Sequence, residues 1–331
     1  MYRIFLAFNL AILVTVSLMA CSGANSETSE VQGTVPSVAD PSSPASKTTG
    51  AFNVDSAMAY LKQQTDFGPR VPGSAAHKAC ADMLAQTLKA MGATVSDSVA
   101  QSVHPVSGNP VEIRNIFAQF NPAASDRVLV LAHYDTRPWA DEDADPANRN
   151  TPIDGANDGA SGVAVALEIA RHAGSLPKGK GLDILLVDQE DSGSSGDDVS
   201  WCLGSTYWAA NLPYDDMNRP RYAILLDMVG GKNAEFRREY FSELAASRIN
   251  DIVWKAAREA GYGSRFVDDI GGAINDDHLP IIRAGIPAID IIETTPTGFN
   301  PTWHTLQDNF ENIDPKTIEM TGNVMYKVIY R

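Results

Sequence analysis

The chain has 331 residues, 44% of them hydrophobic, and a formal net charge of −15 at pH 7. This length allows one large domain or two modest ones, and the acidic balance argues against nucleic acid as a partner. An excess of acid also favours cationic ligands, such as a metal ion or an amino terminus.

The first fifty residues differ in composition from the rest. Arg3 precedes a mostly apolar run over residues 4–19, which is typical of a secretory signal. The run ends in LMAC, which resembles a bacterial lipobox, so we expect residues 1–20 to be a lipoprotein signal and Cys21 to carry the lipid. A signal with an incidental Cys, or an uncleaved anchor, is the alternative. Residues 21–50 are rich in Ser, Thr, Pro, Gly and Ala and are predicted to be a flexible tether.

These features predict an exported protein of a bacterium, either periplasmic or on the outer membrane. Its contact with the membrane is expected through the lipid anchor alone. The sequence does not fix which membrane carries the anchor.

Helical periodicity begins after Asn53, a candidate cap. Ser74 is a candidate cap for a second helix that Gly92 ends, with the apolar stripe Cys80, Met83, Leu84, Leu88 and Met91. Cys80 is therefore predicted to be a core residue. Cys202 could pair with it, but the sequence indicates no disulfide framework.

Strand and helix patterns then alternate to the C-terminus. The predicted strands are 94–99, 111–120, 127–135, 182–188, 222–230 and 287–293. The predicted helices are 162–173, 204–211, 242–260, a short one opening at 275–280, and 314–330. Such alternation is typical of an α/β fold with a twisted, mostly parallel sheet between helices, here mixed because the first strands form an antiparallel-looking hairpin. We expect one domain over residues 51–331.

The stretch 181–193 suggests where the chemistry lies. Its apolar run, residues 184–187, is typical of a strand buried on both faces, and the acids Asp188, Glu190 and Asp191 follow at once. Ligands of open α/β sheets bind beyond the carboxyl ends of the strands. Neighbouring side chains there point in different directions, so one carboxylate can bind a metal while the other acts as general acid or base. An isolated acidic pair would more often be a solvated loop.

Other potential ligands follow other predicted strands. They are His133, Asp135 and Asp227, with Asp158 before a helix and His304 in the loop 301–309. Carboxylate oxygens combined with imidazole nitrogen form a plausible zinc-binding set. A single Asp or His would more often be structural, so the joint pattern carries the prediction.

Six motifs give the chain a family resemblance. They are HYD at 133–135, GANDGASG at 155–162, QED at 189–191, LLDMVG at 225–230, DDH at 276–278 and WHT at 303–305. Their order and spacing resemble those of the zinc-dependent M28 peptidases, which implies a zinc-exopeptidase-like fold. Within this clan the chain most resembles the animal-type glutaminyl cyclases (glutaminyl-peptide cyclotransferases) and their bacterial relatives.

Three features favour a cyclase over an aminopeptidase. Trp303 directly precedes His304, where peptidases usually have a non-aromatic residue. Asp276 lies at the position that cyclases use in a hydrogen-bond network with Asp227. Trp201 lies where the cyclases have an indole in the pocket, although a single Trp is more often a core residue.

The resemblance implies specific roles. Asp158, Asp191 and His304 are expected to hold one zinc ion per chain, although the vertebrate enzymes have Glu at the position of Asp191. Glu190 is the expected acid or base, linked to Asp227 and Asp276. The expected pocket residues are Trp201, Ile274, Phe299 and Trp303. The implied substrates are peptides or proteins with an amino-terminal Gln, and we expect a monomer.

Two alternatives stay open at this point. A di-zinc M28 aminopeptidase would use His133 and Asp227 as additional ligands, and both are present. A catalytically inactive binding protein on the bacterial surface would be marked by loss of a ligand or of Glu190, and none is missing.

Overall fold

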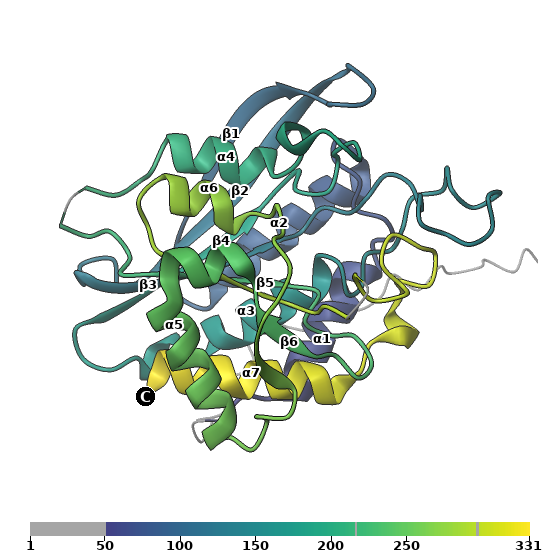
Figure 1. Cartoon of the computed structure of the whole chain (residues 1–331). Helices are drawn as coiled ribbons and strands as arrows, with labels where there is room; N and C mark the ends of the chain where they lie inside the picture. The colour runs from purple at the N-terminus through teal and green to yellow at the C-terminus, as the bar shows by residue number, and fades with distance from the viewer. Residues whose placement is uncertain (1–50, 216, 296–297) are drawn as a thin grey trace, which may run out of the picture. The chain divides into compact units, whose positions relative to one another are not determined.

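The computed structural model describes residues 51–215, 217–295 and 298–331 (Figure 1). The predicted signal, Cys21 and the tether therefore lie outside the described residues. Within the described part, the helices are all too short or too polar to cross a membrane.

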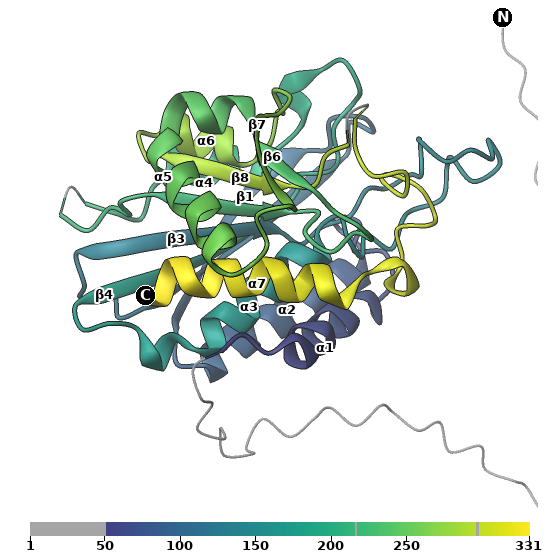
Figure 2. The same cartoon turned by 60° about the horizontal axis from the view of Figure 1, so that its bottom comes forward.

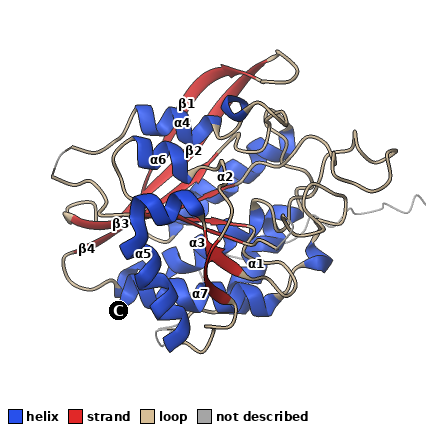
Figure 3. Ribbon diagram, in the orientation of Figure 1, coloured by secondary structure: helices blue, strands red, loops and turns tan. Residues whose placement is uncertain are grey.

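A six-stranded mixed sheet forms the centre of the domain, with helices on both sides (Figure 3). Its strand order is β1 (Thr94–Val103), β2 (Pro110–Phe120), β4 (Lys180–Val187), β3 (Asp126–His133), β5 (Ala223–Asp227) and β8 (Ala288–Ile292). β1 pairs antiparallel with β2, and β2 antiparallel with β4, whereas the β4, β3, β5 and β8 pairings are parallel. The predicted mostly parallel sheet with an opening hairpin is confirmed.

Both faces of the central strands are covered (Figure 2). The core on one face contains residues of α1 (Val54–Thr65), α2 (Ala75–Ala90), α3 (Ala160–Arg171) and α7 (Pro315–Tyr330), and the core on the other face contains residues of α4 (Leu203–Ala210) and α6 (His278–Arg283). In β3, Val128 and Val130 join the first apolar core, while Leu129 and Leu131 join the second. Strands that bury both faces need continuous apolar runs, which explains the pattern of the sequence.

The remaining elements lie around this sandwich. α5 (Tyr240–Glu259) packs against β8, and short 3₁₀ helices span Ala173–Ser175, Asp198–Ser200 and Phe310–Asn312. The two predicted caps are confirmed, because Asn53 accepts from the Ser56 N–H at 3.0 Å and Ser74 from the His77 N–H at 3.1 Å. Cys80 is in the core as predicted, and it and Cys202 are buried, free thiols.

Two features of the fold differ from the prediction. A second sheet of β6 (Phe236–Arg238) and β7 (Phe266–Ile270) was missed, because β6 has three residues and β7 is partly exposed and carries two acids. The strand predicted over 222–230 ends at Asp227, since Met228 has a left-handed backbone with φ 46° that breaks the ladder.

Candidate active site

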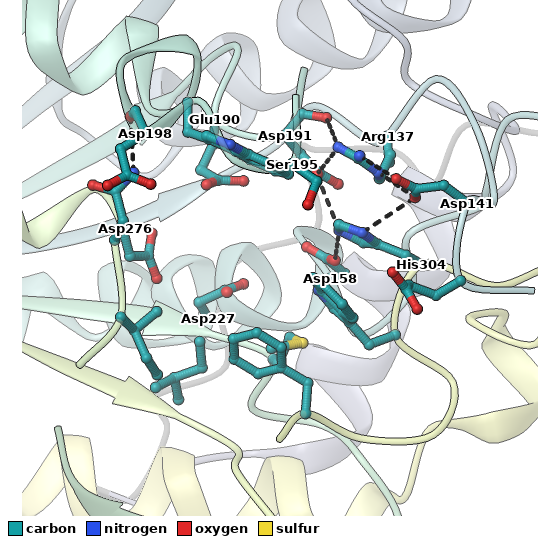
Figure 4. Close-up of a pocket in the computed structure, with 18 of the residues that line it drawn as sticks. Arg137, Asp141, Asp158, Glu190, Asp191, Ser195, Asp198, Asp227, Asp276 and His304 are labelled. Carbon is teal, nitrogen blue, oxygen red and sulfur yellow. Dashed lines mark hydrogen bonds and ion pairs between the residues drawn. The ribbon is translucent and has the colours of Figure 1, made fainter. Parts of the chain in front are cut away.

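A cavity of about 310 Å³ lies beyond the carboxyl ends of the parallel strands (Figure 4). The structure brings all ten predicted catalytic, metal-binding and pocket residues to its walls: Asp158, Glu190, Asp191, Trp201, Asp227, Ile274, Asp276, Phe299, Trp303 and His304. They come from six segments of the chain, spread over about 150 positions. These residues come together because the parallel strands end at the same edge of the sheet, as expected for an open α/β fold.

Strained backbone occurs at or beside several residues of the cavity. Gln189, Met228 and His304 have φ values of 52°, 46° and 53°, a region that non-glycine residues seldom adopt. Such strain tends to cluster at functional sites, where surrounding contacts enforce it. Here the Asp135 carboxylate enforces the turn after Gln189, because it accepts the N–H groups of Glu190 and Asp191 at 3.2 Å each.

The first cluster in the cavity is a candidate metal centre. Asp158, Asp191 and His304 each offer one ligand atom, and these atoms lie within 4.8 Å of one another. His304 Nε2 is 3.1 Å from Asp191 Oδ1 and 3.5 Å from Asp158 Oδ2. Asp158 Oδ2 and Asp191 Oδ2 are buried and receive no hydrogen bond from the described residues. Two carboxylates with unpaired oxygens beside an imidazole fit a zinc ion. Such an ion would have three protein ligands and a fourth coordination position open to substrate.

Outer contacts, which the sequence did not predict, hold these candidate ligands. Asp308 accepts the Asp158 N–H at 3.1 Å, and Asp141 Oδ1 lies 3.4 Å from His304 Nδ1. Gly159, with φ 101°, allows the Asp158 loop to pass close to β3, since a Cβ there would lie 2.9 Å from the Asp135 carbonyl oxygen. Outer partners of this kind orient metal ligands and fix the tautomer of a ligating His.

The second cluster contains Glu190. Its carboxylate, the Cys202 thiol and the Asp276 carboxylate lie within 4.8 Å of one another, and Cys202 Sγ is 3.6 Å from Glu190 Oε1. Burial raises the pKa of Glu190 well above its usual range; His133 opposes this shift, and the charges of Asp191 and Asp276 reinforce it. A carboxyl group of raised pKa is suited to exchanging a proton with substrate near neutral pH.

Further buried acids lie behind Glu190. Burial and the neighbouring Asp227 raise the pKa of Asp276 to about 7. Asp277 accepts a hydrogen bond from Ser205 Oγ at 2.5 Å, and Asp290 on β8 lies within 4.8 Å of Asp276 and His278. The sequence did not single out Asp277 or Asp290, although Asp277 belongs to the DDH motif.

His133 occupies the floor between the two clusters. Its Nε2 lies 3.1 Å from Asp158 Oδ1 and 3.1 Å from Asp227 Oδ1, and the three residues form another group within 4.8 Å. Burial opposes protonation, but the three acids Asp135, Asp158 and Asp227 raise the pKa of His133 well above its usual range. His133, Asp158 and Asp227 therefore form a second candidate metal position, which shares Asp158 with the first.

Aromatic rings form one wall of the cavity. Trp303 stacks on His304 with ring centroids 3.7 Å apart, and Phe299 contacts Trp303 at 4.7 Å. Trp201 lies parallel to His304, at 6.2 Å and an angle of 6°. Ile274 lines the cavity as well. We call the part of the cavity beside these rings and the candidate metal ligands the aromatic slot.

The fold and this site define a class: α/β enzymes with a zinc-exopeptidase-like sheet and a carboxylate-rich centre at its edge. A model of peptidase family M28 matches residues 115–329. The chain therefore belongs to peptidase family M28, as its motifs predicted.

Two curated relatives resemble the chain over different lengths. Glutaminyl-peptide cyclotransferase of Bothrops jararaca is 26% identical over 307 residues, which cover 79% of this chain and 78% of the relative. Aminopeptidase YwaD of Bacillus subtilis is 28% identical over 211 residues, 62% of this chain. The chain spans only 41% of that aminopeptidase's length.

Solved structures give stronger similarity. Glutaminyl cyclase of Bacteroides thetaiotaomicron, bound to N-acetylhistamine, is 48% identical, with a TM-score of 0.81 and coverage of 85% of this chain and 98% of that chain. Glutaminyl cyclase of Porphyromonas gingivalis is 45% identical at a TM-score of 0.81, covering 84% and 98%. A leucine aminopeptidase precursor of Bacteroides thetaiotaomicron is 47% identical at a TM-score of 0.81, covering 85% and 98%.

Proposed function

We propose that this protein is a zinc-dependent glutaminyl cyclase, an acyltransferase that converts the amino-terminal Gln of peptides or proteins to pyroglutamate and releases ammonia. One observation carries the proposal: the aromatic rings of Trp201, Phe299 and Trp303 line the same cavity as Asp158, Asp191, His304 and Glu190. The names of the similar cyclases from Bacteroides and Porphyromonas support it.

The reaction forms one bond and breaks another. The α-nitrogen of Gln attacks the carbon of its own side-chain amide, a new C–N bond closes the ring, and the bond to the amide nitrogen breaks. An amine is mostly protonated at neutral pH, so it must first give up a proton. A zinc ion held by Asp158, Asp191 and His304 would polarise the amide carbonyl and stabilise negative charge on its oxygen.

Glu190 is placed to move the proton. As a carboxylate it accepts a proton from the attacking amine, and as a carboxylic acid it returns that proton to the departing nitrogen, which leaves as ammonia. Burial and neighbouring acids keep its pKa high, which favours the first step, the uptake of the proton. Asp276 has a carboxylate oxygen within 4.8 Å of one of Glu190, and Asp227 lines the same cavity; we assign both to holding Glu190 in place.

The aromatic slot has two roles in this proposal. Its aromatic rings hold the short Gln side chain in the bent shape that brings the amine to the amide. Its apolar surfaces also exclude water that would otherwise hydrolyse the amide. Trp201 and Trp303 are therefore assigned to substrate binding, together with Ile274 and Phe299.

We propose one zinc ion per chain. His133 and Asp227 could complete a second position, and their geometry is what keeps the aminopeptidase alternative open. The lower number follows from the resemblance to the glutaminyl cyclases, and the similarity to the cyclases of Bacteroides and Porphyromonas supports it. Metal analysis of the purified protein tests the number directly.

For the rest of the chain, our proposal follows the sequence. Residues 1–20 are a lipoprotein signal, Cys21 carries the lipid, residues 21–50 are a tether, and residues 51–331 are a monomeric catalytic domain. The protein is then exported and held at the periplasmic or outer-membrane surface. LMAC and the composition of residues 22–50 support this proposal.

Mass spectrometry of peptide products tests the proposed activity. A Gln-initiated peptide should lose the mass of ammonia and keep its length, whereas Ala- and Leu-initiated peptides should be unchanged. Removal of the first residue from any of these peptides, without ammonia loss from Gln, would favour the aminopeptidase.

A further inference from the structure

Arg137 is a buried cation of the cavity that neither the motifs nor the proposed reaction uses. It lies at the start of the irregular loop 136–154 and is 1% exposed. Its Nε and Nη2 donate to the two carboxylate oxygens of Asp141 at 2.6 and 2.5 Å. Its Nη1 donates at 3.3 Å to Asp191 Oδ1 and also to the carbonyl oxygens of Asp191 and Gly193. The guanidinium thus contacts one candidate zinc ligand directly.

A second candidate ligand is reached through Asp141. Asp141 Oδ1 lies 3.4 Å from His304 Nδ1, so the Arg137–Asp141 pair supports the ring on the side opposite the metal cluster (Figure 4). A carboxylate at Nδ1 directs the lone pair of Nε2 toward a metal. Arg137 therefore supports Asp191 by direct contact and His304 through one intermediate.

The guanidinium of Arg137 lies over two indole rings. Its carbon lies 5.1 Å from the ring centroid of Trp139 and 4.8 Å from that of Trp201, and Trp201 is parallel to His304. Arginine stacks on indoles and forms forked hydrogen bonds at the same time, which lysine cannot do. One side chain thus links the candidate metal ligands to the substrate wall.

Charge adds to this geometry. Among the described residues that line the cavity, Arg137 is the only Lys or Arg. Eight acidic residues line the same cavity: Asp141, Glu142, Asp158, Glu190, Asp191, Asp198, Asp227 and Asp276. Its charge reduces the repulsion between the buried carboxylates that must come together to bind a cation.

We propose that Arg137 is a positioning residue that holds Asp191, His304 and Trp201 in one arrangement, so that zinc binding and the Gln-binding slot depend on the same side chain. The proposal rests on the proposed function for the identity of the substrate. It assigns no chemical step to Arg137.

Three variants of the full protein separate the roles of Arg137. Arg137→Gln removes both the positive charge and the paired hydrogen bonds to Asp141. Arg137→Lys keeps the charge but not the paired hydrogen bonds. Arg149→Gln is the control, since Arg149 is an exposed residue of the same loop. Zinc affinity is measured by competition with a chelator, KM and kcat are measured on a Gln-initiated peptide, and thermal unfolding checks the fold.

We expect Arg137→Gln to weaken zinc binding by about 10–100-fold, as is usual for outer partners of metal ligands, and to raise KM. Arg137→Lys should recover most of the zinc affinity because the charge remains beside Asp191. It should not recover KM, because lysine cannot fork onto Asp141 while stacking on Trp201. The Arg149→Gln control should match the wild type in all measurements.

Wild-type zinc affinity and KM in Arg137→Gln would overturn the proposal. A lowered unfolding temperature with unchanged zinc affinity and KM would also overturn it, since the role would then be structural. If Arg137→Gln does not fold, the KM of Arg137→Lys tests the proposal instead. A wild-type KM in Arg137→Lys would contradict it. Zinc affinity is independent of the reaction, so release of amino acids instead of ammonia would refute the proposed function and leave the Arg137 test standing.

Discussion

Glu190 and Asp191 are neighbours in the chain, yet their carboxylates belong to different clusters. Asp191 faces Asp158 and His304, whereas Glu190 faces Cys202 and Asp276. The strained turn at Gln189 and the Asp135 carboxylate, which binds both N–H groups, produce this division. The same division predicts that substitutions at the two positions have different consequences.

Glu190→Gln removes the proton carrier and leaves the volume of the side chain nearly unchanged. We expect bound zinc to be retained and turnover to fall by about 10²–10⁴-fold, the usual contribution of general acid–base catalysis. Steady-state kinetics together with metal analysis provide the measurement. Near-normal turnover would show that the roles within the pair are assigned wrongly.

Asp191→Ala removes a candidate ligand instead. The expected result is loss of zinc from the purified protein, and loss of activity as a consequence. The exposed Asp197, six residues further along, offers a control in Asp197→Ala, which should keep its metal. Zinc retained at the wild-type level in Asp191→Ala would be incompatible with the proposed ligand set.

Acid stability should depend on Glu239, which caps α5. Burial opposes its ionisation, but His278 and the N–H groups of Phe241 and Ser242 hold the pKa of Glu239 down to about 2, below its ordinary 4.5. A carboxylate with a depressed pKa stabilises the fold above its unfolded-state pKa, and this contribution is lost as the pH falls toward 2. The shift corresponds to about 3 kcal/mol.

Denaturant unfolding of wild type and Glu239→Gln between pH 5 and pH 2 measures this contribution. The free energy of unfolding of the wild type should fall more steeply with acid than that of the variant. Exposed Glu319→Gln serves as a control and should follow the wild type. Equal slopes for wild type and Glu239→Gln would contradict the assignment.

Cys21→Ala tests the proposed anchor, which lies outside the described residues. The variant should move from the detergent phase to the aqueous phase in a partition experiment, with its fold and activity unchanged. A variant that still enters the detergent phase would indicate that the signal segment, or another part of the chain, is the anchor.

Much of the fold and of the cavity lining followed from local sequence patterns. Continuous apolar runs identify doubly buried strands such as β4, and polar residues directly after them identify the ligand-binding edge. The residues placed there, Asp158, Glu190, Asp191 and Asp227 among them, do line one cavity. Phe299 and Ile274 came from the family resemblance, because a loop residue has no periodicity from which its direction can be inferred.

The contacts that support the candidate metal ligands could not be predicted from local sequence patterns. Arg137 and Asp141 lie in a loop without periodicity, and the partner of Arg137 on the metal side is 54 positions away. His133 joins Asp227 across 94 positions, so the sequence could not fix its direction. The left-handed backbone of Gln189, Met228 and His304 gives no signal either, since none of them is Gly or Asn.

The proposal of a cyclase can be tested most directly with two peptides that differ only in their first residue, Gln or Leu, mixed in equal amounts with the purified, zinc-loaded protein. Ammonia and free amino acids are quantified in the same reaction. The account predicts ammonia in proportion to the Gln peptide consumed, no free Leu and no shortened peptide. Free Leu or free Gln, with no ammonia, would contradict it and identify the protein as an aminopeptidase.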